Sequence, residues 1–305
     1  MTRFLFRRFF YGLAVLWAVA TLTFALMHVV PGGPFDREQR LPPQVLANIA
    51  AKYHLDDPMI SQYLRYLKGL IRGDLGPSYK YLDRTVTDIV ASTLPVSVLL
   101  GILALAFAVT VALPVGILAA YCQNSWTDRV CLFLATLGIS LPNFILGSLL
   151  IWIFSLQLGW FQAARWGTTT SVVLPTITLG SSAAAYLSYL LRSTLIETLG
   201  ADFIRTARAK GLKETVIIFK HAMRNSISPI LTVMGPLLAY LVTGSFVVEY
   251  VFAIPGMGRF FITAVTDRDY PMIMGVTLVY SMLLVCANLV VDLLYSVTDP
   301  RVKTR

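Results

Sequence analysis

The chain has 305 residues, of which 56% are hydrophobic and only 13% are charged, and its net charge is +9. Soluble proteins of this size carry about 25% charged residues, so the composition argues against a soluble protein and predicts an integral membrane protein with several spans. The basic excess lies mainly at the N-terminus, in a central loop and at the C-terminus. Cytoplasmic loops of membrane proteins collect such charge, so no nucleic-acid partner is needed to explain it.

An apolar run over Phe9–Val30 follows Arg3, Arg7 and Arg8. This run exceeds the apolar region of a signal peptide, which has about 7–15 residues, and no cleavage site of small residues follows it. We therefore predict an uncleaved first span, with the N-terminus in the cytoplasm.

The next segment, 31–93, is polar and mixed in charge, and we expect it on the external side of the membrane, opposite the cytoplasm. We predict one amphipathic helix over 43–53 and a second that begins with Asp57 as its N-cap and Pro58 as its first residue. The residues of this second helix that we expect to face inward are Ile60, Leu64, Leu67 and Ile71. The segment is either a structural cap or a docking surface for a partner.

Five further apolar runs are each long enough to cross a bilayer core of about 30 Å. They cover approximately 94–121, 131–158, 172–191, 226–248 and 272–297, and the prolines that open or interrupt them are Pro95, Pro114, Pro142, Pro175 and Pro236. The predicted fold is therefore an all-α membrane protein with six transmembrane helices, forming a single domain over 1–305. Six spans place both termini and the basic central loop on one side, the cytoplasm.

The loop 197–225 is the most basic interval between two apolar runs. We predict a short helix capped by Asp202 and ended by Gly211 in a left-handed conformation. Neighbours three and four residues apart share a helix face, which groups Phe203 with Ile204 and Ala207 in this helix, and Val216 with Ile217 and Met223 in a second one. Charge alone is equally consistent with an ordinary cytoplasmic loop.

The string Arg205-Thr206-Ala207-Arg208-Ala209-Lys210-Gly211 resembles the cytoplasmic coupling loop of ABC importer permeases, in particular of the peptide-importer branch. The first position, often Glu in the family, is Arg205 here. In the family this loop docks into a cleft on an ATPase subunit. The resemblance implies that the ATPase-coupling residues are Phe203, Arg205, Thr206, Ala207, Arg208, Ala209, Lys210 and Gly211.

A second group of motifs surrounds the turn Pro255-Gly256-Met257-Gly258. Its glycine spacing lacks the third glycine of a dinucleotide-binding loop, so that interpretation fails. The turn, with Glu249 before it and Arg268-Asp269-Tyr270-Pro271 after it, resembles the last external loop of dipeptide and oligopeptide importer permeases. Strings such as Gly76-Pro77-Ser78 in the first external segment resemble the oligopeptide permeases in particular. The residues implied as an external gate or binding-protein contact are Glu249, Pro255, Gly256, Gly258, Arg268, Asp269 and Tyr270.

The chain has no Gly-x-x-x-x-Gly-Lys-Ser/Thr loop, so we expect no ATP site of its own. The three histidines, His28, His54 and His221, lie far apart without metal-ligand spacing, so we expect no metal and no cofactor in this chain. The resemblance implies the permease subunit of an ATP-driven oligopeptide importer in a bacterial inner membrane. Its implied partners are a second homologous permease, two ATPase subunits that bind ATP and Mg, a periplasmic or lipid-anchored solute-binding protein and membrane lipid. Related dipeptide, nickel and glutathione importers are alternatives.

An ion-coupled carrier is a further alternative, but such carriers place acidic residues or histidines in mid-span, and this chain has few candidates. A membrane enzyme would need paired nucleophiles, bases or metal ligands, and no such constellation stands out. Uncharged polar residues on the fifth run suit a path for peptides, and the candidates are Thr232, Thr243 and Ser245.

Overall fold

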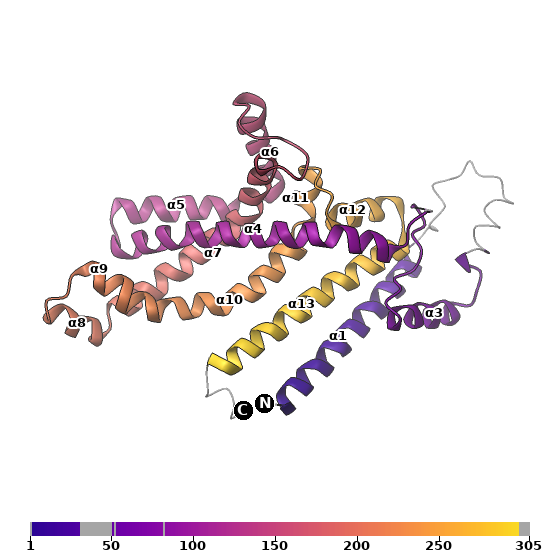
Figure 1. The fold of residues 1–305 in the computed structure, drawn as a ribbon, viewed down its shortest axis with the longest axis horizontal. Helices are drawn as coiled ribbons and strands as arrows, with labels where there is room; N and C mark the ends of the chain where they lie inside the picture. The colour runs from indigo at the N-terminus through magenta and orange to yellow at the C-terminus, as the bar shows by residue number, and fades with distance from the viewer. Residues whose placement is uncertain (1, 31–50, 52, 82, 299–305) are drawn as a thin grey trace. The chain divides into compact units, whose positions relative to one another are not determined.

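The computed structural model describes residues 2–30, 51, 53–81 and 83–298. In this part of the chain helices and loops make up the fold, with one isolated bridge between Pro77 and Thr85, so the all-α prediction is confirmed. The helices (Figure 1) are α1 (Thr2–Val29), α3 (Met59–Ile71), α4 (Val86–Tyr121), α5 (Trp126–Ser140), α6 (Asn143–Leu150), α7 (Thr169–Leu199), α8 (Asp202–Ala209), α9 (Glu214–Val216), α10 (Met223–Thr243), α11 (Phe246–Val251), α12 (Met257–Asp267) and α13 (Tyr270–Thr298), with π-helical segments η1 (Ile151–Gln157) and η2 (Ile217–Ala222).

Five stretches of helix are long and apolar enough to cross a membrane, and a sixth candidate is the bent pair formed by α5 and the α6–η1 helix. The two members of this pair meet at an angle of 107°. Pro142 explains the bend, because proline disfavours the helical conformation for the residue before it. Leu141 is accordingly extended, with φ −82° and ψ 118°. The run predicted as one span over 131–158 is therefore two helices.

The other predicted proline interruptions leave their helices continuous. Pro95 and Pro114 lie within α4, Pro175 within α7 and Pro236 within α10. Neighbouring helices and local adjustment can satisfy the carbonyl that a proline frees. Of these five prolines, Pro142 marks a break between helices and the other four lie inside continuous helices.

The chain divides into two compact units, 1–97 with 255–285 and 98–254 with 286–305. The core of the first unit joins the start of α4 to α12 and α13. Its buried residues are Val86, Ile89, Val90, Met257, Ala264, Met272, Ile273 and Val276. Gly275 allows the close approach of α13 to α4, because a Cβ there would lie 2.6 Å from Val86 Cγ1.

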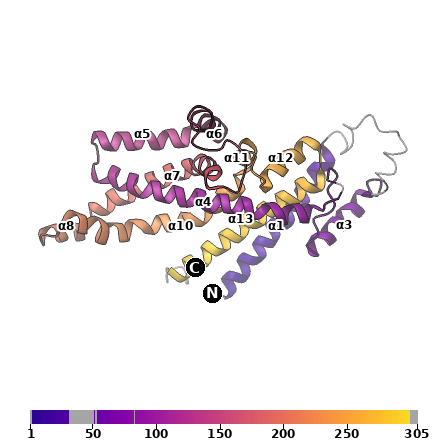
Figure 2. The ribbon, with the colours of Figure 1, turned by 45° about the horizontal axis from the view of Figure 1, so that its top comes forward.

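In the second unit α7 packs against both α5 and α10 (Figure 2). Small residues permit this packing, as they commonly do between membrane helices. A Cβ at Gly138 of α5 would lie 3.0 Å from the Ser181 carbonyl oxygen of α7, and one at Gly180 would lie 2.7 Å from the Ala104 carbonyl oxygen of α4. The buried face of α7 carries a leucine series: Leu174, Leu179, Leu187, Leu191 and Leu195.

The orientation predicted for α3 is wrong. Ile60, Leu64 and Ile71 are exposed, Leu67 is half-buried, and the helix instead turns Gln62, Tyr63 and Tyr66 toward the protein. Its N-cap is Pro58 rather than Asp57, and Met59 is its first residue. Apolar spacing identified the residues that share a face, but in a membrane protein that face can turn away from the protein. The helix predicted over 43–53 lies almost entirely outside the described residues.

Candidate functional site

The basic loop folds into a hairpin of α8 and the continuous α9–η2 segment, and it lies beyond the ends of α7 and α10 (Figure 1). The N-cap of α8 is Ala201, so the prediction that Asp202 caps this helix is wrong. Asp202 is the first helical residue, where a negative charge favours the helix dipole. Its carboxylate also lies 3.5 Å from the guanidinium of Arg205.

Gly211 ends α8 with a φ of +75°, which confirms the predicted left-handed conformation. Its amide donates to the Arg208 carbonyl at 2.9 Å, and the Leu212 amide donates to the Ala207 carbonyl at 3.3 Å. These bonds satisfy carbonyls that the end of a helix leaves free. The chain can then reverse within four residues and begin α9 at Glu214.

A small apolar core holds the hairpin together. Its buried residues are Ala120, Leu195, Ile204, Ala207, Ile217 and Ala222, which come from α4, α7, α8 and η2. Phe203 and Val216, predicted on the same two apolar faces, are exposed at their edges instead. Ala207 therefore serves packing within this unit, and its side chain is not part of the outward surface.

The outward surface of α8 carries Phe203, Arg205, Thr206, Arg208 and Ala209, continued by Lys210 and Gly211. The Thr206 hydroxyl donates to the Asp202 carbonyl of its own helix at 3.0 Å. Arg208 pairs with Glu214, with Nε 2.7 Å from Oε1, and this hydrogen bond raises the pKa of the Arg208 guanidinium. Arg208 thus closes the hairpin, while Arg205 is three-quarters exposed.

The hairpin is joined directly to two candidate spans. The Ser226 hydroxyl of α10 lies 3.0 Å from Thr198 Oγ1 and 3.3 Å from the Thr194 carbonyl, both on α7. The π-helical η2 carries the hairpin into α10, and π-helical turns occur frequently at functional sites. The hairpin is therefore continuous with both α7 and α10, which are bonded to each other at its base.

Sequence reasoning missed an ion pair between Asp128 of α5 and Arg192 of α7. Arg192 Nε and Nη2 each lie 2.7 Å from one carboxylate oxygen of Asp128, in a bidentate arrangement. The Asp128 side chain is 3% exposed and that of Arg192 is 21% exposed. The available signal was Arg192 itself, because a charged residue in an apolar helix commonly has a partner.

In the first unit, Asp269 connects two motifs that lie far apart in the sequence. Its buried carboxylate accepts a hydrogen bond from the Ser78 hydroxyl, and bonds from the amides of Tyr79 at 3.2 Å and Lys80 at 3.4 Å. It also accepts from the Met272 amide at 3.3 Å, at the start of α13. The carboxylate therefore holds the segment after Gly76-Pro77 against the beginning of α13.

We expect Asp269→Ala to loosen residues 78–81, because the substitution removes the carboxylate that accepts from the buried Ser78 hydroxyl and the partly buried Tyr79 amide. A lost hydrogen bond to a buried group costs about 1–3 kcal/mol. Hydrogen exchange of the Tyr79 amide should then be at least about tenfold faster, since about 1.4 kcal/mol corresponds to a factor of ten. Asp267→Asn, two residues away and partly exposed, is the control. Equal protection in Asp269→Ala and the unmodified protein would contradict this role.

The neighbouring predicted residues have mainly structural positions. Gly256, directly after Pro255, is the N-cap of α12, and Gly258 lies in the first turn of this helix. The amide of Met257, the first residue of α12, donates to Ser97 Oγ at 2.9 Å. Arg268 ends α12 in a left-handed conformation, with φ +57°, and Tyr270 is the first residue of α13.

In the second unit, Glu249 is fully buried, and one carboxylate oxygen lies 2.6 Å from the Ser245 hydroxyl. Ser245 is also buried and lies 2.9 Å from the Val242 carbonyl. The Thr243 hydroxyl donates to the Ala239 carbonyl of its own helix at 2.8 Å, and Thr232 is half-buried on α10. Of these residues, the two threonines retain some exposed surface.

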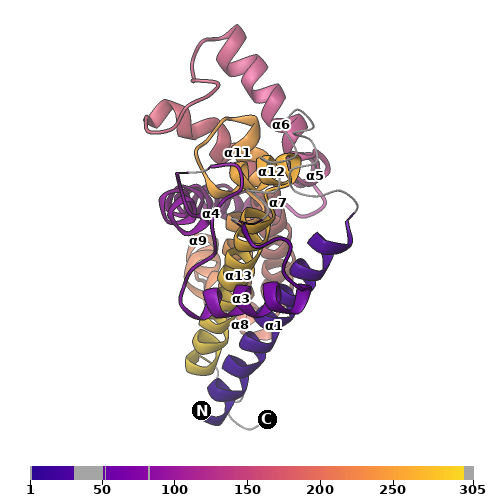
Figure 3. The ribbon, with the colours of Figure 1, turned by 90° about the vertical axis from the view of Figure 1, so that its right-hand side faces the viewer.

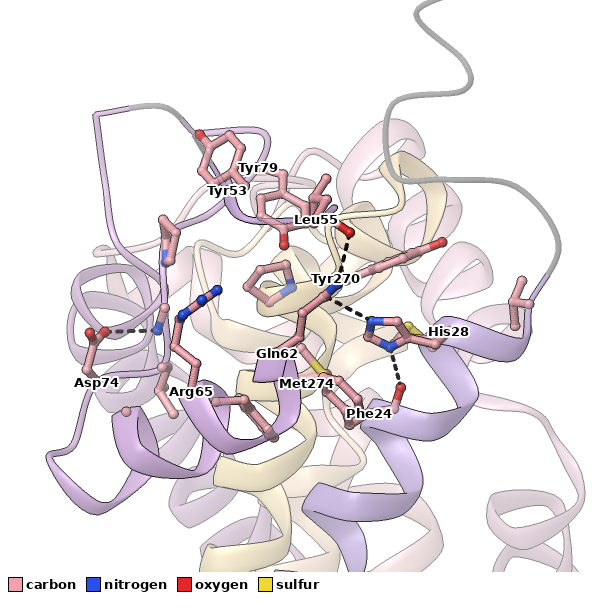
Figure 4. A pocket seen from close by; sticks show the side chains of 18 of the residues that line it. Phe24, His28, Tyr53, Leu55, Gln62, Arg65, Asp74, Tyr79, Tyr270 and Met274 are labelled. Atoms are coloured by element: carbon pink, nitrogen blue, oxygen red, sulfur yellow. Dashed lines mark hydrogen bonds between the residues drawn. The ribbon is translucent and has the colours of Figure 1, made fainter. Parts of the chain in front are cut away.

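A cavity of about 600 Å³ lies in the first unit, between the ends of α1 and α3, the segment 74–79 and the start of α13. Figure 4 shows that Gln62 of α3 and His28 of α1 meet in it, with Gln62 Oε1 3.3 Å from His28 Nε2. Tyr66 also lines it, and burial raises the pKa of the Tyr66 phenol to about 12. The cavity is mixed in character, with tyrosine rings beside Arg65 and Asp74.

Two family models match the chain and together cover nearly all of it. Residues 112–304 match the binding-protein-dependent transport system inner membrane component, and residues 1–100 match the N-terminal component of the same type of transport system. The dipeptide transport system permease protein DppB of Bacillus subtilis is 46% identical over 99% of this chain and 98% of its own length. The oligopeptide transport system permease protein OppB of Haemophilus influenzae is 42% identical, covering 99% of this chain and all of its own.

Solved structures show the same fold at lower identity. A chain of an amino acid ABC transporter with histidines has a TM-score of 0.54 at 17% identity, over 68% of this chain and 93% of its own. A chain of the MetNI methionine ABC transporter has a TM-score of 0.53 at 19% identity, over 67% of this chain and 95% of its own. Two family models over nearly the whole chain and full-length relatives at 42–46% identity show that the chain belongs to the binding-protein-dependent transport system inner membrane components, in the branch of peptide ABC importer permeases.

Proposed function

We propose that this chain forms half of the translocation path of an ATP-driven importer for oligopeptides and couples that path to ATPase subunits in trans. The observation that carries the coupling role is the division of the hairpin into two faces. Ile204 and Ala207 fix α8 to the protein, while Arg205 and Lys210 remain exposed on a rigid support. This arrangement suits a helix that docks into a groove on another subunit and transmits its movement.

The partners we propose are a second homologous permease, two ATPase subunits that bind ATP and Mg, and a periplasmic or lipid-anchored solute-binding protein. The external segment 31–93 and the residues from Pro255 to Tyr270 would receive the binding protein and close the path. Asp269 and Glu249 are buried, so neither is proposed to contact the partner. The proposed contribution of Asp269 is to hold the segment 78–80, and that of Glu249 is to fix the turn at Ser245.

The hairpin 197–225 and both termini are proposed to lie in the cytoplasm, since the basic residues concentrate there. A cysteine at position 305 should react with an impermeant thiol reagent only in inside-out vesicles. Reaction in cells from the periplasmic side would overturn this orientation.

The oligopeptide substrate is supported by the permease of Haemophilus influenzae, whose name specifies oligopeptides. A dipeptide substrate is the second candidate, supported by the 46% identity to the dipeptide permease of Bacillus subtilis. Thr232 and Thr243 are proposed path residues on α10, together with Ser245 nearby. Mass spectrometry of the ligand that co-purifies with the binding protein would distinguish di- from oligopeptides.

The coupling role is tested by Arg205→Glu combined with Lys210→Glu. Charge reversal at two exposed positions leaves the hairpin core intact but opposes charge-assisted hydrogen bonds to the ATPase, which are about twice as strong as neutral ones. We expect the ATPase subunits to co-purify at least tenfold less and peptide uptake to be lost. The control is Arg129→Glu, an exposed residue on α5. Normal uptake with the ATPase still bound would contradict the coupling role and leave the hairpin as an ordinary basic cytoplasmic loop.

A further inference from the structure

The helix α3 has three different faces. The face toward α1 carries Gln62, Tyr63 and Tyr66. A second face carries Ile60, Leu64 and Ile71, which are among the most exposed apolar side chains of the first unit, Ile71 being 89% exposed. Because successive helical residues turn by about 100°, this apolar stripe occupies a narrow sector that points away from α1.

The third face is basic. Arg65, Lys68 and Arg72 recur at intervals of three and four residues and are all exposed. Arg65 also pairs with Asp57. By helical geometry the basic stripe borders the apolar stripe on one side. A helix with an apolar face flanked by lysine and arginine is typical of helices that lie in the membrane interface.

Contacts with α1 place this helix at the depth of the membrane. The apolar part of α1 after Arg8 runs from Phe9 to Val29, about 31 Å at 1.5 Å per residue, which matches the hydrocarbon core of about 30 Å. Tyr63 shares a hydrogen bond of 2.7 Å with Thr21, and its ring lies 5.3 Å from that of Phe24. Thr21 is about 12 Å along the helix from Val29.

With the apolar part of α1 in the hydrocarbon core, the contact with Thr21 puts the Tyr63 side chain at the depth of one leaflet. The helix α3 crosses α1 before the end of α1, as Figure 3 shows. Side chains on the outward apolar face of α1, such as Leu22 and Leu26, are exposed as expected for contact with lipid. The apolar stripe of α3 is thus at the level of a lipid-facing surface.

We propose that α3 is an interfacial helix that inserts Ile60, Leu64 and Ile71 into the lipid and binds the phosphates of anionic phospholipids with Arg65, Lys68 and Arg72. Lipid is preferred to a protein partner as the occupant because the contacts of Tyr63 with Thr21 and Phe24 hold α3 beside the apolar part of α1. The leaflet is the outer one under the proposed orientation, but insertion itself does not depend on that orientation or on the transport function.

Spin labels on cysteines test the insertion in the full-length protein, reconstituted in vesicles of phosphatidylethanolamine and phosphatidylglycerol. The native cysteines to replace first are Cys122, Cys131 and Cys286. Labels at Leu64→Cys and Ile71→Cys are compared with Leu22→Cys on α1, a lipid reference, and Asp83→Cys, an exposed loop position. For the labels at positions 64, 71 and 22, we expect collisions with oxygen to exceed collisions with a nickel chelate several-fold. For the label at position 83, we expect collisions with the nickel chelate to dominate.

Two results would overturn the proposal. If the nickel chelate reaches the labels at positions 64 and 71 as readily as the label at position 83, the apolar stripe lies in water. Exclusion of both reagents in the complete transporter would show that another protein chain covers it. The headgroup contact has its own test. Omitting phosphatidylglycerol should reduce the ratio of oxygen collisions to nickel-chelate collisions for the label at position 71. The double substitution Lys68→Glu with Arg72→Glu should make this ratio independent of phosphatidylglycerol. A ratio that does not respond to phosphatidylglycerol would contradict the phosphate contact.

Discussion

Ala207→Trp should abolish uptake by this importer, although Ala207 does not lie on the outward surface of the hairpin. The methyl group is buried among Ile204, Ile217 and Ala222. Extra volume in a packed core typically costs about 1–3 kcal/mol for added methylenes, and an indole adds far more than that. Since α8 has only eight residues, it would have to leave its position, and the proposed docking surface would leave with it.

The matched control is Ala209→Trp, which places the same indole two residues away on an exposed position. Hydrogen exchange should report a loosened hairpin for Ala207→Trp and an unchanged one for Ala209→Trp. If α8 docks as proposed, Ala209→Trp should weaken ATPase binding by obstructing the contact while the hairpin stays folded. Full uptake by Ala207→Trp would show that the position of α8 does not matter for coupling.

The second large effect is expected at the ion pair between Asp128 and Arg192. Asp128→Leu would leave the Arg192 guanidinium, only 21% exposed, without its bidentate partner. Breaking a buried pair from one side typically costs about 3–5 kcal/mol, and the lower end applies because Arg192 keeps some contact with solvent. The expected result is a clear fall in the thermal unfolding midpoint of the purified protein in detergent.

The double variant Asp128→Leu with Arg192→Met should recover most of this loss, because replacing both partners by apolar residues is often neutral or stabilising. Glu214→Gln offers a contrast, since its pair with Arg208 has a similar 2.7 Å contact but side chains that are 45% and 42% exposed. Such exposed pairs contribute about 0–1 kcal/mol. If Asp128→Leu lowers the thermal unfolding midpoint only as little as Glu214→Gln does, burial does not make the pair of Asp128 and Arg192 more important for stability than an exposed pair.

Composition and local motifs determined a large part of this protein without any structure. Long apolar runs predict membrane helices because the bilayer core requires about 20 apolar residues per span, and the helices at α1, α4, α7, α10 and α13 agree with that requirement. Gly211 was predictable as a left-handed residue because glycine lacks the Cβ that makes this conformation costly. The string from Arg205 to Gly211 and the turn at Pro255 led to the family because they are specific local patterns.

Only the tertiary structure decided which side of each amphipathic helix faces the protein. In α8 the apolar side turns inward, so that Ala207 became a core residue, whereas in α3 Ile60 and Ile71 turn away from the protein. Periodicity is the same in both cases, because it depends on the helical repeat and not on the environment that the apolar stripe contacts. The partnership of Asp269 with Ser78, 191 residues apart, and that of Asp128 with Arg192 depend likewise on chain topology, since hydrogen bonds between distant residues leave no local pattern in the sequence.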